Sequence, residues 1–286
     1  MSFITLTTDF GTKDHFVGAV KGAIYSELAD AKIVDITHEI SPFNITETAY
    51  ILKNSYKSFP EGTIHIVGVD SELNEDNKHI AMEMDNHFFV CADNGIISMI
   101  ASEIQPTKIV EINIHERIES SFPVLDVFVQ VACFIARGGN LTVIGKEITT
   151  FKKLIEIQPK VNQAQTQIIG GVIYIDNYGN VITNISKKMF NDIGKGRKYK
   201  LTISRYSFTK IFKKYNEIVG NNSEDTRQFD GNKLAIFNSA GFLEIAIYRS
   251  NLNTVGGASS LLGLEYRDPI IIEFFTESKT EYTLLS

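Results

Sequence analysis

Residues 4–24 read ITLTTDFGTKDHFVGAVKGAI and predict a strand, a turn and a helix in one run. Ile4 and Leu6 alternate with threonines, as in a buried β-strand. The triplet at residues 9–11, Asp-Phe-Gly, ends the strand, because glycine permits a sharp turn. Beyond the turn, apolar residues recur at helical spacing as far as Ile24. A strand, turn and helix at the start of the chain indicate an α/β fold.

Asp9 lies directly after this first strand, at the sheet edge where ligands bind in open α/β folds. The turn lacks both glycine-rich phosphate-binding patterns. The carboxylates of Asp9 and Asp14 would repel phosphate but accept hydrogen bonds from hydroxyls or an ammonium group. The alternative is structural: Asp9 caps the turn and Asp14 caps the helix.

Composition limits the classes of function. The chain has 286 residues, 43% of them hydrophobic, which is enough for one large or two ordinary domains. Its net charge of −6 disfavours nucleic acid as a partner. We expect a cytoplasmic protein without membrane spans. Cys91 and Cys133 are expected to be buried free thiols, and the scattered histidines predict no metal site.

The first half alternates strands and helices, which predicts a doubly wound α/β layer domain over residues 1–155. Asp70 follows the apolar strand at residues 63–69, at the same edge as Asp9. Asn44 is expected to begin a helix, with Glu47 completing a capping box. Phe43 is suited either to stack on a planar ligand or to pack against the start of that helix.

The pattern changes after a polar stretch at residues 149–167, which we interpret as the domain boundary. Residues 165–286 contain many short strand-like segments and little helix, which predicts a small β-barrel or a sandwich. One turn carries Asp176, Tyr178 and Asn180, which offer an acceptor, an aromatic ring and an amide to one ligand. The alternative is a hairpin turn that binds nothing.

Together these segments resemble one enzyme family along the whole chain. The segments are TDFGTKDHFVGAVKG, HEISPFNI, ADNG, SSFPVLDVF, DNYGNVITNI and NSAGFLEIA, in this order. They resemble the S-adenosylmethionine (SAM) hydroxide adenosyltransferases, relatives of fluorinase and chlorinase that hydrolyse SAM to adenosine and methionine. The resemblance implies an α/β domain, then a β-barrel. It also implies a homotrimer with ligand sites between one subunit's first domain and its neighbour's second.

The resemblance also implies roles for individual residues, with SAM as the substrate and no cofactor. Asp70 matches the catalytic carboxylate that orients the attacking water. Asp9 is expected at the ribose diol and Asp14 near the methionine portion. The full set of implied substrate-binding residues is Asp9, Asp14, Phe43, Phe122, Asp176, Tyr178, Asn180, Ser239, Glu244, Ile247 and Arg249.

Two catalytic positions depart from the family pattern. The expected Arg falls at Asn77, the expected His falls at Pro123, and the usual DPGVG run after the catalytic Asp is replaced by SELN. Lys78 adjoins the Arg position, but lysine lacks the fork of donors of a guanidinium. His79 is a candidate for a new catalytic group, and its alternative is an exposed loop histidine.

Three functions are consistent with these residues. The first is SAM hydrolysis with Asp70 orienting the water, weakened by the loss of Arg and His. The second is a non-catalytic protein that binds SAM or adenosine in the same pocket. Halide transfer is disfavoured, because Val124 stands where the halogenating relatives have a small residue and a negative pocket does not attract an anion.

Overall fold

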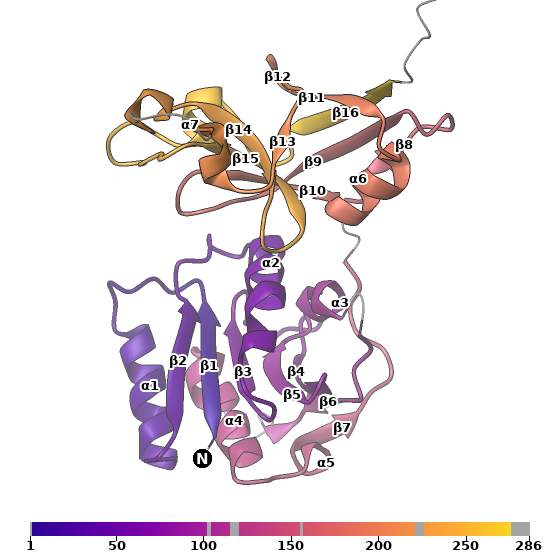
Figure 1. Cartoon of the computed structure of the whole chain (residues 1–286). Helices are drawn as coiled ribbons and strands as arrows, with labels where there is room; N and C mark the ends of the chain where they lie inside the picture. Colours follow the sequence, from indigo (N-terminus) through magenta and orange to yellow (C-terminus); the bar gives the residue numbers. More distant parts are fainter. Residues whose placement is uncertain (1, 102–103, 115–119, 155–156, 221–225, 276–286) are drawn as a thin grey trace, which may run out of the picture. The chain divides into compact units, whose positions relative to one another are not determined.

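The computed structural model describes residues 2–101, 104–114, 120–154, 157–220 and 226–275. The chain separates into two compact units, Met1–Glu156 and Ile157–Ser286, each described here by itself (Figure 1). Within the described residues, no helix is both long enough and apolar enough to cross a membrane.

The first unit contains a seven-stranded sheet and its covering helices. The strands are β1 (Phe3–Thr8), β2 (Lys32–Thr37), β3 (Ile64–Gly68), β4 (His79–Met84), β5 (His87–Ala92), β6 (Lys108–Ile112) and β7 (Gly145–Glu147). The helices are α1 (Phe16–Glu27), α2 (Ile45–Ser55), the 3-10 turn η1 (Tyr56–Ser58), α3 (Ile96–Ile100), the π-helical η3 (Val124–Phe128), α4 (Val129–Ala136) and α5 (Leu141–Ile144).

The strand order of this sheet is β2-β1-β3-β5-β4-β6-β7. The first four are parallel, and β4, β6 and β7 add antiparallel pairings. β4 and β5 form a hairpin whose turn residues, Asp85 and Asn86, both have positive φ, as the favoured two-residue hairpin turn requires. The predicted strands are therefore confirmed, in a sheet that is mixed rather than wholly parallel.

Helices cover both faces of the sheet. One buried cluster joins Ile4 and Leu6 of β1 to α1 and α4, and a second joins Val67 of β3 and Met82 of β4 to α2 and α3. Alternate residues of a strand point to opposite faces, so strands such as β3, β4 and β5 contribute to both clusters. This arrangement leaves the carboxyl ends of β1, β2 and β3 at one edge (Figure 1).

The predicted start of a helix at Asn44 is confirmed. Asn44 caps α2, because its Oδ1 accepts the Glu47 amide at 3.1 Å while Glu47 Oε2 accepts from Asn44 Nδ2. The alternative in which Asp14 caps the first helix is not met: α1 begins at Phe16, after His15, and no side chain caps it.

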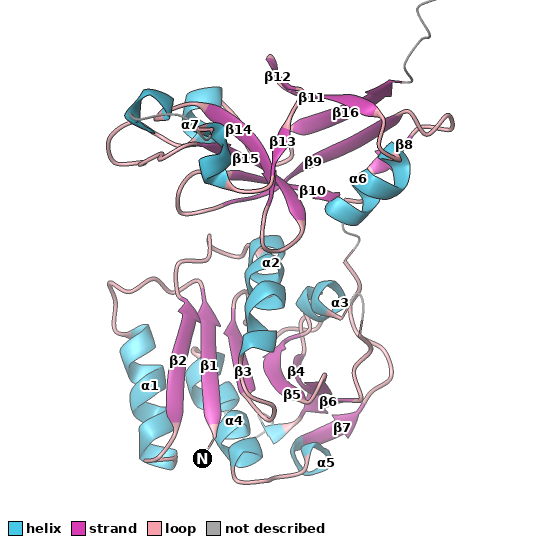
Figure 2. Cartoon of the chain, viewed as in Figure 1, coloured by secondary structure: helices cyan, strands magenta, loops and turns pink. Residues whose placement is uncertain are grey.

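The second unit is built around a nine-stranded sheet (Figure 2). Its strands are β8 (Lys160–Val161), β9 (Gln167–Ile175), β10 (Val181–Ser186), β11 (Lys198–Ile203), β12 (Tyr206–Phe208), β13 (Ile211–Phe212), β14 (Lys233–Phe237), β15 (Phe242–Ile247) and β16 (Pro269–Phe275). Its helices are α6 (Lys187–Gly194), α7 (Ala258–Leu262) and the 3-10 turns η4 (Tyr215–Ile218) and η5 (Thr226–Phe229).

This sheet is nearly a barrel. The order is β12-β11-β16-β9-β10-β15-β14-β13, with β8 beside β9, so the two end strands β12 and β13 are neighbours in sequence. A single buried cluster fills it, including Ile168, Leu201, Ile245 and Ile272. The sequence suggested that the stretch at residues 149–167 is irregular throughout. Its end instead forms β8 and the start of β9.

Candidate functional site

Asp9 and Asp70 leave neighbouring strands at the same edge of the first sheet. Thr8 of β1 pairs with Gly68 of β3, so each carboxylate follows its strand within two residues. Asp9 Oδ2 accepts the amide of Phe43 at 2.9 Å. Burial raises the pKa of the Asp9 carboxyl, hydrogen bonds from the Phe43 amide and its own amide lower it, and the Asp70 charge raises it further. The structure thus brings together Asp9, Phe43 and Asp70.

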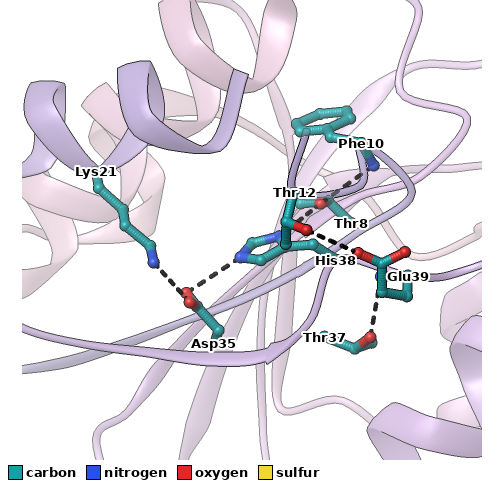
Figure 3. A network of polar contacts seen from close by, with 8 residues as sticks. All are labelled: Thr8, Phe10, Thr12, Lys21, Asp35, Thr37, His38 and Glu39. Carbon is teal, nitrogen blue, oxygen red and sulfur yellow. Dashed lines mark hydrogen bonds and ion pairs between the residues drawn. The ribbon is translucent and has the colours of Figure 1, made fainter. Parts of the chain in front are cut away.

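A chain of polar contacts ties the end of β1 to the end of β2 (Figure 3). Thr8 Oγ1 lies 2.8 Å from Nδ1 of the buried His38, whose Nε2 lies 3.1 Å from Asp35 Oδ1. Lys21 of α1 binds the other oxygen of Asp35. The Asp35 carboxylate lies at Nε2, so Nδ1 is the ring nitrogen that meets the Thr8 hydroxyl. Thr8 is thereby fixed directly before Asp9.

Two further hydrogen bonds join the turn after β1 to the loop after β2. The Gly11 amide donates to the His38 carbonyl at 2.7 Å, and Thr12 Oγ1 donates to Glu39 Oε1 at 3.3 Å. Burial raises the pKa of Asp35, but hydrogen bonds from Lys21 and His38 lower it by more, so that the net pKa is lowered. Asp35 therefore stays ionised and holds both partners.

The surroundings of Phe43 and Asp14 test the structural alternative for each residue. Phe43 has φ +62° and is 72% exposed, so it does not pack against the start of α2. An exposed ring in a strained conformation suits contact with a ligand better than a structural role. Asp14 is exposed and does not cap α1, so the structure gives it no capping role.

The loop after β3, in which SELN replaces the family's DPGVG run, is held by hydrogen bonds from buried side chains. Asp70 has φ +45°, and its carbonyl accepts Nδ2 of Asn77 at 2.9 Å. His79 is 1% exposed, lies at the start of β4 and donates from Nε2 to the Ser71 carbonyl at 2.9 Å. The reading of His79 as an exposed loop histidine was therefore wrong. The burial of Asn77 was not anticipated.

The segment that carries Pro123 packs beneath the same edge. Pro123 precedes η3, and Val124 lies where a side chain on Gly68 would collide, with its Cγ2 2.9 Å from an added Cβ. Phe122 forms an aromatic cluster with Phe10 and Phe16, at ring distances of 5.4 and 5.3 Å. Phe122 therefore packs against the turn that follows Asp9, through its contact with Phe10.

In the second unit, Asp176 organises the turn that was predicted to bind ligand. Its Oδ1 accepts the amides of Tyr178 and Asn180, both at 2.8 Å, and its Oδ2 accepts Asn180 Nδ2 at 2.9 Å. Asn180 is buried, whereas Tyr178 is 64% exposed. The three residues lie together as predicted, with Tyr178 presented to the outside.

Glu244 lies in the same unit on β15. It is 3% exposed, and Tyr215 donates to its Oε1 at 2.6 Å. Burial raises the pKa of the Glu244 carboxyl, the Tyr215 hydroxyl lowers it, and the charge of Asp176 raises it again. Glu244 and Asp176 are therefore electrostatically coupled.

The remaining predicted residues lie at the two ends of β15. Ser239 is exposed in the β14–β15 turn, Ile247 is buried at the end of β15, and Arg249 has φ +52° and pairs with Asp230 at 3.7 Å. Among the described residues, no hydrogen bond joins Ser239 to Arg249. Their shared use by one ligand remains a prediction.

A shallow hollow in the first unit lies elsewhere. It is lined by Asp76, Asp93, Thr150, Phe151 and Lys152, none of which was predicted to bind substrate. Among the described residues, no group of three or more His, Cys, Asp or Glu side chains is arranged to hold a metal ion. Cys91 and Cys133 are free and buried, as predicted.

Sequence reasoning missed four residues that shape the site. His38, Asn94, Tyr215 and Asn238 each bond a predicted residue or its neighbour. Three of them stood in motifs already identified: His38 in HEISPFNI, Asn94 in ADNG and Asn238 in NSAGFLEIA. Their position after strand ends was a usable signal. Tyr215 carried none, because only the fold brings it to Glu244.

Comparison with known proteins identifies a family for most of the chain. Family models of the SAM hydroxide adenosyltransferase N-terminal and C-terminal domains match residues 4–145 and 170–271. The chain belongs to the SAM hydroxide adenosyltransferase family.

Individual relatives extend over most of the chain. A "(R)-S-adenosyl-L-methionine hydrolase" of Methanocaldococcus jannaschii is 33% identical, covering 95% of this chain and 96% of the relative. A "Fluorinase" of Nocardia brasiliensis is 22% identical, covering 70% of this chain and 77% of the relative. An uncharacterized conserved protein of Thermotoga maritima has a solved structure with a TM-score of 0.79 and 30% identity, covering 95% of this chain and 99% of that one.

Proposed function

We propose that this chain hydrolyses SAM to adenosine and L-methionine. Water attacks ribose C5′ in line with the C5′–sulfur bond, the bond breaks, and sulfur leaves as the neutral thioether of methionine. The water gives up one proton. A carboxylate that orients the water and accepts this proton assists the attack. Asp70 is the residue proposed for this role.

The single observation that carries this proposal is the pairing of Asp9 and Asp70 at one sheet edge. Asp9 offers a carboxylate to the ribose diol, and Asp70 lies close enough to influence its charge. Two carboxylates at one edge attract the cationic sulfonium of SAM. Phe43, whose amide holds Asp9, presents its ring for contact with the nucleoside.

Residues of the second unit are proposed to bind the rest of the substrate. Asp176 and Glu244 supply negative charge for the methionine ammonium group, and Tyr178 supplies an exposed ring for the adenine. We further propose a homotrimer in which the two sets of residues come from neighbouring subunits. The relative of Methanocaldococcus jannaschii is named for the (R) epimer of SAM, and we propose that epimer as the substrate here.

The test is product formation by the purified protein. Incubation with the separated (R) epimer of SAM should give adenosine and methionine in equal amounts above a control without protein, and the (S) epimer should give less of both. Asp70→Asn should lower turnover by about 10²- to 10⁴-fold, because it removes a general base, with adenosine affinity nearly unchanged. Equal turnover in Asp70→Asn would reject the role of Asp70.

A second candidate function follows from Asn77 and Pro123. With neither the Arg nor the His of the family present, the same pocket would serve a protein that binds SAM or adenosine without turnover. Calorimetry on the same sample distinguishes the two functions. Tight binding of SAM with no adenosine released would favour recognition over catalysis.

A further inference from the structure

Four consecutive carbonyls after β3, at residues 69–72, accept hydrogen bonds from buried side chains. Asn94 Nδ2 donates to the carbonyls of Val69 at 2.9 Å and Asp70 at 3.3 Å. Asn77 Nδ2 donates to the carbonyls of Asp70 at 2.9 Å and Glu72 at 3.1 Å, and His79 Nε2 donates to that of Ser71 at 2.9 Å. The three donors are 5%, 5% and 1% exposed.

These contacts fix the backbone angles of Asp70. The Val69 carbonyl belongs to the peptide plane before Asp70, and the Asp70 carbonyl belongs to the plane after it. Holding both planes leaves little freedom in φ and ψ. Asp70 lies in the left-handed region, which a residue with a side chain occupies at a cost. Fixed planes also fix the direction in which its side chain leaves the backbone.

The orientation of Asn77 supports a dedicated role. Both of its contacts are to carbonyl oxygens, so the atom that faces them is the amide nitrogen. Its Oδ1 is buried and has no hydrogen-bond partner among the described residues. Burying an acceptor without a partner lowers stability, and proteins tolerate such costs mainly at functional sites.

We propose that Asn77, His79 and Asn94 form a carbonyl clamp that positions the Asp70 carboxylate for catalysis. The three are positioning residues, since each acts through the backbone of residues 69–72. This inference rests on the proposed hydrolysis and extends it. In this chain, a rigid backbone under Asp70 compensates for the absent Arg and His, because a well-placed carboxylate needs fewer partners to hold the water.

The test compares Asn94→Asp and Asn77→Ala with the unchanged protein. Asn94→Asp retains the acceptor for the Ile96 amide but replaces the donor by a carboxylate that repels two carbonyls. Each variant should lower kcat by about 10²-fold through misplacement of Asp70, with the adenosine Kd changed by less than about threefold. Asn54→Asp is the matched control, because exposed Asn54 also donates to a carbonyl, that of Tyr50. It should leave kcat unchanged.

His79 provides a rescue experiment. Gln places an amide nitrogen near the position of Nε2, so His79→Gln should retain most of the kcat that His79→Ala loses. All assays are run at a temperature at which circular dichroism shows each variant folded. Equal kcat in all variants, or loss of kcat only where the fold is lost, would overturn the clamp.

A crystal structure of the Asn77→Ala, Asn94→Asp double variant separates this inference from the proposed function. The clamp predicts that Asp70 leaves the left-handed region in that structure. Asp70 unmoved at φ near its present value would overturn the clamp whether or not the protein is active. Absence of adenosine from the unchanged protein would instead reject hydrolysis.

Discussion

Asp9 is a carboxylate whose surroundings oppose its charge, and we propose that it binds the ribose diol. Burial and Asp70 raise its pKa, while the Phe43 amide favours the ionised form. An acid with a raised pKa in the folded state lowers stability at neutral pH, because folding then disfavours its charge. The residue is suited to a ligand that donates hydrogen bonds.

Asp9→Asn should therefore raise the melting temperature and weaken adenosine binding by roughly 10- to 100-fold, the usual value of a hydrogen bond to a charged group. Calorimetry across pH supplies the check. Affinity of the unchanged protein should fall as pH drops through the raised pKa of Asp9, whereas the variant should show no such fall. Equal affinities at pH 7 would remove Asp9 from the site.

His65 gives a second prediction at this scale. It is fully buried, with Nδ1 2.6 Å from Thr5 Oγ1 and Nε2 3.2 Å from His87 Nδ1, and burial lowers its pKa to about 3. The unfolded chain binds this proton near pH 6.5 and the folded chain only near pH 3. Stability should therefore fall as pH drops from 6.5 toward 3, by up to about 1.4 kcal/mol per pH unit from this group.

Urea unfolding at pH 7 and pH 5 measures this loss. His65→Gln should reduce the difference between the two pH values, even if it lowers stability at both. The exposed His15, changed to Gln, is the control and should leave the difference intact. The same difference in all three proteins would assign the acid sensitivity to other groups.

The sequence predicted single residues well where a motif surrounded them. Asp9, Asp70 and Asp176 were identified from their places after strands or in a turn, and the structure puts each at such a place. It failed for Asn77 and His79, because a polar loop sequence does not reveal that its side chains turn inward. Burial depends on contacts with distant elements, here β3 and η3.

At the scale of elements, the position of Gly68 at the end of β3 requires glycine, because neighbouring side chains leave no room for a Cβ. An added Cβ would lie 2.9 Å from Val124 Cγ2 and 3.2 Å from Phe10 Cζ. Gly68→Ala should cost about 1–3 kcal/mol of stability through overpacking. It should also lower turnover, since Asp70 lies two residues on.

Gly22 is the matched control for this substitution. It lies in α1 with no atom within 4 Å of an added Cβ, so Gly22→Ala should stabilise the protein by roughly 0.5–1 kcal/mol. Urea midpoints of the two variants give the comparison. A stable and fully active Gly68→Ala protein would show that η3 can move away from the strand end.

The elements themselves followed from periodicity. Strands β1, β2, β3 and β5, and the cap of α2 at Asn44, lie where apolar patterns and capping residues placed them. The sequence offered Asp14 as an alternative cap for the first helix, but α1 begins at Phe16 without a side-chain cap. β8 was missed, since two residues in a polar stretch give no period.

At the scale of the whole molecule, the resemblance predicted more than periodicity did. Alternation predicted an α/β unit and a β unit, and the structure contains both kinds of sheet. Alternation did not indicate that β4 turns back beside β5, which depends on the Asp85-Asn86 turn. Assembly is not encoded in any local pattern, so the trimer remains a proposal.

Light scattering of the purified protein tests that proposal. A trimer should have a mass of three times the 32.0-kDa chain. If neighbouring subunits share each ligand, adenosine at 100 times its Kd should stabilise the trimer by about 2.7 kcal/mol. Both the melting temperature and the fraction of trimer should therefore rise. A monomer that binds adenosine as tightly would exclude shared sites.

The closeness of Asp9 and Asp70 has a consequence for product release. In the proposed reaction the substrate arrives as a sulfonium cation, which the two carboxylates would attract. After the bond breaks, sulfur is neutral and the positive charge has left as a proton. The attraction that favoured entry of the substrate therefore does not retain adenosine. The reaction thus removes the charge attraction that would otherwise slow product release. The affinity for SAM should weaken with added salt, while the affinity for adenosine should not.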